Sequence, residues 1–327
     1  MAPASPPPLL TIWAVSDDKA GNANQALGLA EAVQRLVPAA IATKRIAWRA
    51  PFGRLPTRLI PPGALSPDAD PIAPPWPDLW IGTGRASVPL GMRMKGWSEG
   101  RTFVVHTQHP RVPASRFDLV APPKHDRLAG PNVFPITGAP HRVTPGRLAA
   151  ELAQFEAMLA PLPSPRAAVL IGGRSKAYDL SPERAGRIAD ALDAALEKAG
   201  ASLLLTFSRR TPAPARRIIA ERLAERPGII WNDQGPNPYF AFLAAADYIA
   251  VTEDSTNMLV EAASTGRPIF VIGMDGAHAR KRAFHADLEA RGAARPFGGE
   301  FYGWTYAPLR ETERLAEEVV RRMAERA

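Results

Sequence analysis

The stretch AAVLIGGRSK, residues 167–176, carries the strongest fold signal in the sequence. Five apolar residues, Ala167–Ile171, are followed at once by two glycines and then by a short polar loop. A brief apolar run that ends in a glycine-rich turn predicts a buried parallel strand, with its loop at the carboxyl edge of a sheet. Further strands and helices are expected on both sides of this strand in the sequence.

The residues that follow continue a regular strand and helix alternation. Ser181-Pro182-Glu183 has the N-cap, the first-position proline and the acid that begin a helix, and Gly200 is placed to end it. The further expected elements are a strand at Leu203–Phe207, a helix at Ala213–Ala224, a strand at Tyr248–Val251, a helix at Asn257–Thr265 and a strand at Pro268–Ile272. Such alternation is typical of a parallel sheet covered by helices on both faces.

The first half repeats the pattern less regularly. Strands are expected at Leu9–Val15, Ile41–Ala47, Leu79–Ile81, Thr102–His106 and Leu119–Ala121, and helices at Asn22–Val37 and Thr144–Leu159. The proline-rich residues 161–165 separate the halves, and a charged helix is expected at Glu311–Glu325. The sequence therefore predicts an α/β protein of two Rossmann-like domains facing a central cleft. Their expected bounds are 1–160 and 161–309, followed by a terminal helix in 310–327.

Composition narrows the classes of function. Of 327 residues, 46% are hydrophobic and 22% are charged, which is ordinary for a globular protein, and the absence of cysteine excludes disulfides, thiolate metal sites and a cysteine nucleophile. We find no apolar run of about 18 residues and no signal-peptide pattern at the N-terminus, so we expect a cytoplasmic location, peripheral to the inner face of the membrane. The net charge is +8, of which residues 1–160 supply +6, and this favours an anionic partner.

Three loops of the second half follow predicted strands and carry groups that bind phosphate or ribose. Paired glycines allow close backbone approach to an anion, two arginines can neutralise a diphosphate, and a helix start favours negative charge. Glu261 lies about one turn into its helix, where a carboxylate can accept hydrogen bonds from a ribose diol. The candidate nucleotide-sugar-binding residues are Gly172, Gly173, Arg174, Ser175, Lys176, Ser208, Arg209, Arg210, Asp254, Ser255, Thr256, Asn257 and Glu261.

The first half offers candidates for catalysis and for binding an acceptor. The loop at residues 16–25 combines acidic, basic and amide side chains after the first strand, and a His-acid pair lies at residues 125–126. The candidate catalytic residues are Asp18, His125 and Asp126. The candidate acceptor-binding residues are Lys19, Gly21, Asn22, Gln25, Gly84 and Arg85.

Other features favour or exclude particular partners. Residues 44–60 hold Lys44, Arg45, Arg49, Arg54 and Arg58 among apolar side chains with no acid, which suits an anionic membrane surface. A partly buried connection with solvated arginines is the alternative. No aromatic and basic module typical of nucleic-acid binding is present, and neither the paired histidines at residues 106–109 nor the acids at 68–70 form a metal-ligand set. We expect no metal and no cofactor.

An ordered set of motifs resembles one known family. The motifs are SDDKAGNANQ at 16–25, PKHD at 123–126, NV at 132–133, TGA at 137–139, GG at 172–173 and TEDS at 252–255. They resemble the bacterial relatives of the plant "elongated mitochondria" fission factor, a family to which glycosyltransferase activity is ascribed, over residues 10–310. The second half is also similar to the peptidoglycan GlcNAc transferase family. The resemblance implies a GT-B fold, a nucleotide-sugar site in the second domain, an acceptor site in the first, and a last helix that returns to the first domain. It also implies phosphate and ribose roles for Gly173, Ser175 and Glu261, and it gives no reason to transfer the fission role.

The expected activity is metal-independent transfer of a sugar from a nucleotide-diphosphate sugar to an envelope glycan or lipid-linked acceptor. Two alternatives remain open at this point. One is a nucleotide-sugar 2-epimerase, which shares the two-domain fold and needs no acceptor. The other is a non-catalytic scaffold of the same fold that recruits a partner to a membrane surface, and it would tolerate the loss of Glu261.

Overall fold

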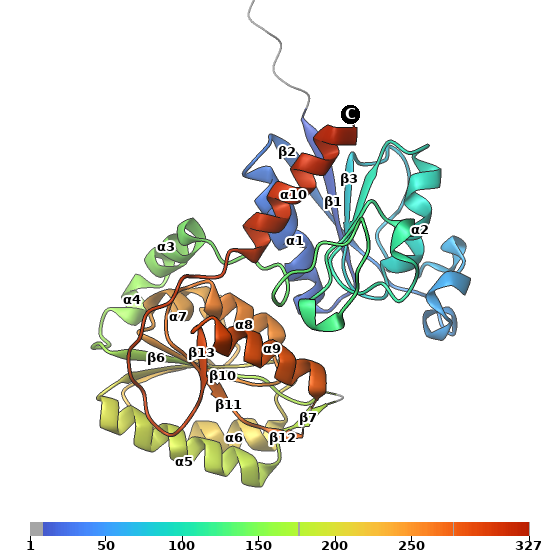
Figure 1. The fold of residues 1–327 in the computed structure, drawn as a ribbon. Helices are drawn as coiled ribbons and strands as arrows, with labels where there is room; N and C mark the ends of the chain where they lie inside the picture. The colour runs from blue at the N-terminus through green and yellow to red at the C-terminus, as the bar shows by residue number, and fades with distance from the viewer. Residues whose placement is uncertain (1–8, 176, 277, 327) are drawn as a thin grey trace, which may run out of the picture. The chain divides into compact units, whose positions relative to one another are not determined.

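The computed structural model describes residues 9–175, 177–276 and 278–326. They form two compact units: unit 1 runs to Arg142 and resumes at Arg310, and unit 2 is Val143–Leu309. Each unit is an α/β layer structure built on a parallel sheet (Figure 1). Among the described residues, no helix combines the length and the apolar character that a membrane span requires.

Unit 1 contains a five-stranded sheet in the order β2-β1-β3-β4-β5, with every pairing parallel. Its strands are β1 (Leu10–Ser16), β2 (Ala39–Arg45), β3 (Leu79–Gly82), β4 (Phe103–His106) and β5 (Leu119–Val120). Its helices are α1 (Ala20–Gln34), α2 (Val88–Trp97) and α10 (Glu311–Arg326), with short 3₁₀ turns η1 (Phe52–Arg54), η2 (Thr57–Leu59), η3 (Pro62–Ala64), η4 (Ala114–Arg116) and η5 (Lys124–Asp126).

Period-two alternation of the strand residues divides the core of unit 1 between the two faces of its sheet. Ile12 of β1 packs with Leu29 of α1 and Leu315 of α10, whereas Trp13 faces Leu90 and Met94 of α2 on the other side. Helix α10 therefore lies beside α1 on one face of the sheet, as Figure 1 shows. The C-terminal segment completes the hydrophobic cover of a sheet formed by residues far upstream.

Unit 2 contains a six-stranded parallel sheet in the order β13-β11-β10-β6-β8-β9. Its strands are β6 (Arg166–Ile171), β8 (Ser202–Phe207), β9 (Gly228–Ile230), β10 (Tyr248–Thr252), β11 (Ile269–Ile272) and β13 (Ala294–Pro296), and β7 (Tyr178–Asp179) pairs with β12 (Asp275–Gly276) outside it. Its helices are α3 (Pro145–Gln154), α4 (Glu156–Leu159), α5 (Pro182–Ala199), α6 (Ala213–Arg222), α7 (Tyr239–Ala245), α8 (Thr256–Ala263) and α9 (Ala279–Ala290). Taken in chain order, these six strands are arranged 6-5-4-1-2-3, which is the Rossmann order.

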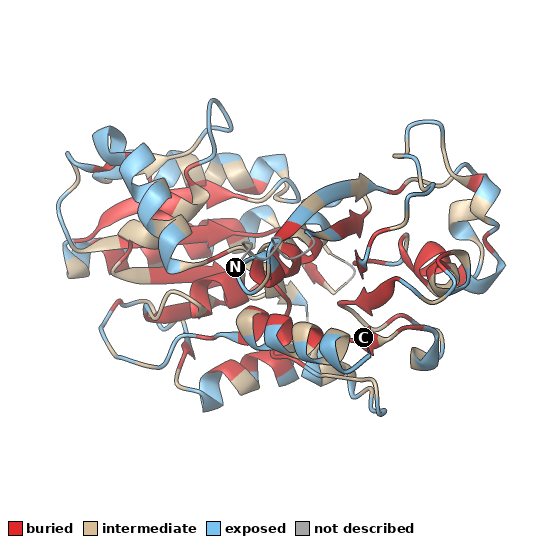
Figure 2. Ribbon diagram, turned by 90° about the horizontal axis from the view of Figure 1, so that it is seen from above, coloured by how far each residue is buried: buried red, intermediate tan, exposed pale blue. Residues whose placement is uncertain are grey.

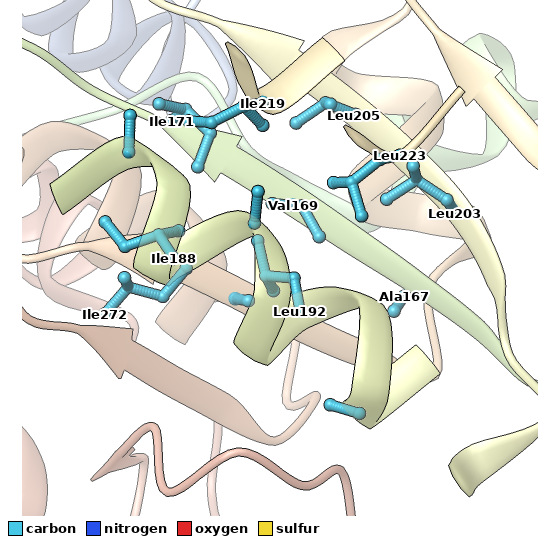
Figure 3. Close-up of a cluster of buried hydrophobic side chains, with 14 of the residues drawn as sticks. Ala167, Val169, Ile171, Ile188, Leu192, Leu203, Leu205, Ile219, Leu223 and Ile272 are labelled. Carbon is cyan, nitrogen blue, oxygen red and sulfur yellow. The ribbon is translucent and has the colours of Figure 1, made fainter. Parts of the chain in front are cut away.

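Both faces of the unit 2 sheet are buried. Val169, Leu203 and their neighbours two residues on point toward α5 and α6, where Figure 3 shows them packed against Ile188, Leu192, Ile219 and Leu223. The intervening residues face a second cluster beneath α7, α8 and α9. Figure 2 shows the same layering, with buried strands and with helices exposed on their outer sides. Each fully buried Leu or Ile stabilises the fold by roughly 1.5–3 kcal/mol.

Most expected elements are confirmed within one or two residues, including the Ser181 cap of α5 and the left-handed Gly200 that ends it at φ 59°. The helix expected at Thr144–Leu159 was wrong in its continuity, because the chain breaks at Phe155 into α3 and α4. The two units divide at Arg142 and Val143, rather than at 160 and 161. The physical reason is that Phe155 and Leu159 pack into the core of unit 2, which assigns both helices to that unit.

Candidate functional site

The Rossmann order places the first and fourth strands of unit 2, β6 and β10, side by side. Strand connections leave to opposite sides at this position, and ligands of doubly wound sheets bind there, outside the carboxyl ends of the strands. Gly172 and Gly173 directly follow β6, and Glu253 and Asp254 directly follow β10. Two of the three predicted phosphate loops therefore meet at the switch point of this sheet.

Asp254 holds these loops together. Its side chain is fully buried, Oδ1 accepts a hydrogen bond from Thr252 Oγ1 at 2.8 Å, and Oδ2 accepts from the Gly173 amide at 3.2 Å. Arg210, which follows β8, reaches the same Oδ2 at 2.9 Å. A buried carboxylate with this many donors positions the backbone around it.

The two glycines leave no room for a side chain. A Cβ at position 172 would lie 1.9 Å from Asp254 Oδ1, and one at position 173 would lie 2.0 Å from the Arg210 carbonyl oxygen. The Arg174 amide donates to that carbonyl at 3.0 Å. Glycine is therefore needed at both positions, because the loop packs closely against the Asp254 side chain and the Arg210 backbone.

Two cations flank Asp254. The Arg210 guanidinium is about half exposed, with 45% of its side-chain area accessible. Lys281 of α9 donates from Nζ to the Asp254 carbonyl oxygen at 3.0 Å and to Thr256 Oγ1. Burial lowers the pKa of Lys281 to about 8, and repulsion by Arg210 adds to the shift while Asp254 opposes it. Asp254 therefore has two positive groups within hydrogen-bond distance.

Several other candidate nucleotide-sugar-binding residues form hydrogen bonds with the local backbone. Ser175 Oγ accepts from the Tyr178 amide at 3.1 Å, Ser208 Oγ accepts from the Arg210 amide at 3.2 Å, and Ser255 caps α8 by accepting from Met258. Arg174 pairs with Asp179 at 2.9 Å, which directs its guanidinium to a surface partner. Arg209 is exposed, Asn257 lies in the first turn of α8, and Lys176 lies outside the described residues.

Glu261 is buried, with only 5% of its area exposed, and it faces α7. Its Oε2 accepts a hydrogen bond of 2.5 Å from the Tyr239 hydroxyl. Burial raises the pKa of Glu261 to about 7, while the Tyr239 hydrogen bond and the positive charge of Arg147 pull it down. A titratable group displaced this far by its surroundings is typical of functional sites.

Unit 1 has its own switch point, between β1 and β3. Asp17 accepts from Asn22 Nδ2 at 2.7 Å and from Lys19 Nζ at 2.8 Å, and Gln108 Nε2 donates to Asn22 Oδ1 at 3.1 Å and to Gln25 Oε1 at 3.0 Å. Gly84 borders this network in a left-handed conformation, with φ 78°, and a Cβ there would lie 2.5 Å from Asn22 Nδ2. Lys19, Asn22, Gln25 and Gly84 thus gather at one edge, with Gly21 in the first turn of α1.

The predicted catalytic residues are spread along that edge. Asp18 is exposed beside Asp17, whereas His125 and Asp126 lie in η5, which follows β5. Strands β1 and β5 are three steps apart in the sheet, or about 14 Å. The structure therefore does not bring the two predicted sources of a base together.

Arg85, predicted to contact an acceptor, is exposed after β3 and also bonds the neighbouring backbone. Its guanidinium donates to the Gly53 carbonyl oxygen at 2.5 Å and to that of Leu55. These bonds hold the 3₁₀ segment η1 against β3's loop. Two of the five N–H donors of this exposed guanidinium thus stabilise the local backbone of unit 1.

The paired histidines at residues 106–109 lie at the end of β4 and just after it. His106 is buried, and burial with the nearby charge of His109 lowers its pKa to about 3. Within residues 9–175, 177–276 and 278–326, no group of three or more His, Asp or Glu side chains gathers in a metal-binding arrangement.

Sequence reasoning missed several residues of these sites. Lys281 and Arg147 lie far from the loops in sequence, and nothing in their local patterns marks them. Tyr239 was not among the predicted site residues. Asp17, adjacent to the chosen Asp18, and Gln108, just past β4, could have been found from their positions after strands that end at the same edge.

Comparison with solved structures shows the same fold. The chain is similar to UDP-GlcNAc 2-epimerase from Methanocaldococcus jannaschii, with a TM-score of 0.55 at 11% identity over 95% of this chain and 100% of that chain. It is similar to the epimerase from Neisseria meningitidis bound to UDP-GlcNAc, with a TM-score of 0.51 at 13% identity over 95% and 91%. A glycotransferase of kitacinnamycin gives a TM-score of 0.50 at 12% identity over 98% and 94%. These likenesses establish the GT-B type of fold.

Comparison of sequences identifies the family. The chain is 31% identical over 277 residues to mitochondrial fission protein ELM1 of Arabidopsis thaliana, covering 76% of this chain, and it spans 65% of the length of that protein. It is 26% identical over 351 residues to the uncharacterized protein RP120 of Rickettsia prowazekii (strain Madrid E), covering 94% of this chain and 97% of that one. The family model for mitochondrial fission ELM1 matches residues 20–323. The chain belongs to the mitochondrial fission ELM1 family.

Proposed function

We propose that unit 2 binds a nucleotide-diphosphate sugar and that the protein transfers the sugar to an acceptor. The observation that carries this proposal is the arrangement at the switch point, where Gly172, Gly173 and Arg210 surround the buried carboxylate of Asp254. A half-exposed guanidinium beside a glycine turn, at the carboxyl edge of a Rossmann sheet, suits the phosphates of a nucleotide. Glu261, on the helix that begins at this edge, is the proposed acceptor of the ribose hydroxyls.

The proposed reaction is a displacement at the anomeric carbon of the donor sugar. An acceptor hydroxyl attacks the anomeric carbon of the donor sugar and forms the new glycosidic bond. The bond between that carbon and the phosphate oxygen breaks, and the nucleoside diphosphate leaves with the electron pair. The hydroxyl proton passes to a carboxylate of unit 1, for which Asp18 is the proposed base and His125 with Asp126 the alternative. Arg210 stabilises the charge that develops on the leaving diphosphate.

The proposed transferase does not depend on a metal ion. A diphosphate that leaves without a metal needs protein cations in its place, and the half-exposed guanidinium of Arg210 is of this kind. Transfer that persists in EDTA would support this, whereas transfer that requires added Mg²⁺ or Mn²⁺ would contradict it.

A glycan or lipid-linked acceptor at a membrane surface is the proposed second substrate. Leu59 is 59% exposed in η2, next to the exposed Arg54 and Arg58. Arg45 and Arg49 are exposed as well, and each also bonds a backbone oxygen, that of Asp68 and that of Gly63. The exposed arginines Arg49, Arg54 and Arg58 are the proposed basic and partly apolar surface that fits anionic lipid.

The deciding experiment is a panel of nucleotide sugars, namely the UDP, GDP, CMP, ADP and dTDP forms, measured by thermal shift and calorimetry with and without Mg²⁺. The donor that binds is then incubated with protein and with lipid-linked acceptors, and products are separated by chromatography. Sugar transfer to the acceptor is the expected result. Conversion of the sugar without any acceptor would favour a 2-epimerase, and no binding by any nucleotide would overturn the proposal in favour of a scaffold.

A further inference from the structure

Lys281 lies in the first turn of α9 and is only partly exposed. Its Nζ contacts two neutral acceptors, the Asp254 carbonyl oxygen and Thr256 Oγ1, both at the start of α8. An ammonium group has three N–H donors, so two are used here. The third donor and the positive charge are left for another partner.

The nearby carboxylates do not supply that partner. Both oxygens of Asp254 are already occupied by Thr252, the Gly173 amide and Arg210. Glu253 turns the other way, where Oε1 accepts from the Met274 amide at 2.6 Å. Within the part of the chain that the structure describes, Lys281 makes no ion pair.

Charge balance at this edge points to an anion. Arg210 and Lys281 contact Asp254 from its side-chain and main-chain ends, so two positive charges share one negative charge. A partly buried cation costs free energy unless it is paired. Burial lowers the pKa of Lys281, the charge of Asp254 opposes this shift only in part, and a bound anion would raise the pKa again.

We propose that Lys281 is a binding residue for a diphosphate group and acts with Arg210, one on each end of Asp254. The inference rests on the proposed function, because it assigns a further ligand to the same donor site. Two phosphates carry enough charge for both cations, and Lys281 binds as a flexible point charge while Arg210 can engage two oxygens at once. Asp254 is then a positioning residue that fixes the spacing of the two cations.

The test measures affinity for inorganic pyrophosphate and for UDP by calorimetry, in EDTA. Lys281→Met keeps the length of the side chain and removes its charge, and Lys281→Arg restores a cation. Lys198→Met is the matched control, because Lys198 is an exposed lysine of the same unit in the last turn of α5, paired with Glu300 at 2.6 Å. Thermal melting of each variant checks folding, and Lys281→Gln replaces Lys281→Met if the latter does not fold.

Loss of the charge in Lys281→Met should lower the affinity for pyrophosphate and for UDP by about tenfold or more. The affinity should recover in Lys281→Arg and stay unchanged in Lys198→Met. Equal affinity of wild type and Lys281→Met would overturn the inference, and so would wild type that binds no diphosphate at all. Farnesyl diphosphate separates the possible sources of the group. If it or pyrophosphate binds through Lys281 while no nucleotide does, the diphosphate site stands and the nucleotide-sugar proposal fails.

Discussion

The Tyr239 hydroxyl lies 2.5 Å from Oε2 of Glu261 and joins the first residue of α7 to the middle of α8. Both side chains lie in a buried environment that raises the pKa of each, by desolvation first and by their mutual interaction second for Tyr239. The bond fixes the carboxyl group of Glu261 in place before any ligand arrives. A pre-positioned acceptor loses less conformational entropy when it binds a diol.

Glu261 should make the stability of the protein depend on pH. Its folded pKa of about 7 lies above the ordinary value of 4.5, so the folded state holds the proton more tightly. The contribution of this carboxyl group to the free energy of unfolding should therefore be lost as pH rises from about 4.5 to 7, by at most about 3 kcal/mol, while the buried His106 and His141, whose pKa values are lowered to about 3 and about 4, act in the opposite direction. Glu261→Gln should remove this contribution, as measured by urea denaturation at a series of pH values.

The control for this measurement is Glu183→Gln. Glu183 is a helical glutamate of the same unit with 82% of its side chain exposed. Its replacement should leave the pH dependence of wild type in place. Identical slopes in wild type and Glu261→Gln would show that the buried environment does not perturb this carboxyl group.

Gly173→Ala should weaken nucleotide binding, because the new methyl group would lie 2.0 Å from the Arg210 carbonyl oxygen and must displace the loop. We expect affinity for the bound nucleotide sugar to fall by about tenfold or more. Gly298→Ala is the matched control, since a Cβ at that position meets nothing within 4 Å. Calorimetry on both variants decides the point, and undiminished binding by Gly173→Ala would remove the loop from the site.

Sequence patterns predicted the loops better than the contacts within them. Strand ends can be found from apolar runs, and all strands of a parallel sheet end at common edges, so Gly172, Asp254 and Asn22 were found without coordinates. Lys281 was missed because its role depends on where α9 packs, which no local pattern encodes. Helix α2 was missed because Pro89, Gly91 and Gly96 weaken its helical signal, and Gly91 is needed there for close packing on Phe117, 3.2 Å from its Cβ position.

The neighbours Asp17 and Asp18 should respond differently to loss of charge. Asp17 is 12% exposed and bonds Lys19 and Asn22, so Asp17→Asn should lower stability by about 1–3 kcal/mol. Asp18 is exposed, so Asp18→Asn should change stability by less than about 0.5 kcal/mol. If Asp18 is the base, the same substitution should lower kcat by about a hundredfold or more at unchanged donor affinity. Full activity in Asp18→Asn would leave His125 and Asp126 as the candidates.

Helix α10 should be essential to the stability of unit 1. Leu315 is fully buried against α1, and Glu311 accepts from the Thr137 amide at 3.1 Å, which ties the start of the helix to the segment after η5. Leu315→Ala should therefore cost about 2–5 kcal/mol, measured by chemical denaturation. The exposed Glu317→Ala on the same helix should be nearly neutral. Comparable stability of the two variants would mean that α10 is not part of the core.

The basic segment offers a direct test of membrane contact. Arg49, Arg54 and Arg58 are exposed in a stretch without acids, and Leu59 stands beside them with 59% of its area accessible. Flotation with vesicles that contain anionic lipid should recover the protein at low salt, and recovery should fall as salt rises, since each basic residue near the surface adds about 1 kcal/mol. Charge reversal of these three arginines to Glu should abolish recovery. Charge reversal of Arg187 and Arg217, which are exposed on helices of unit 2, should leave recovery unchanged. Equal loss of recovery in the triple and the double variant would show that binding depends on net charge alone.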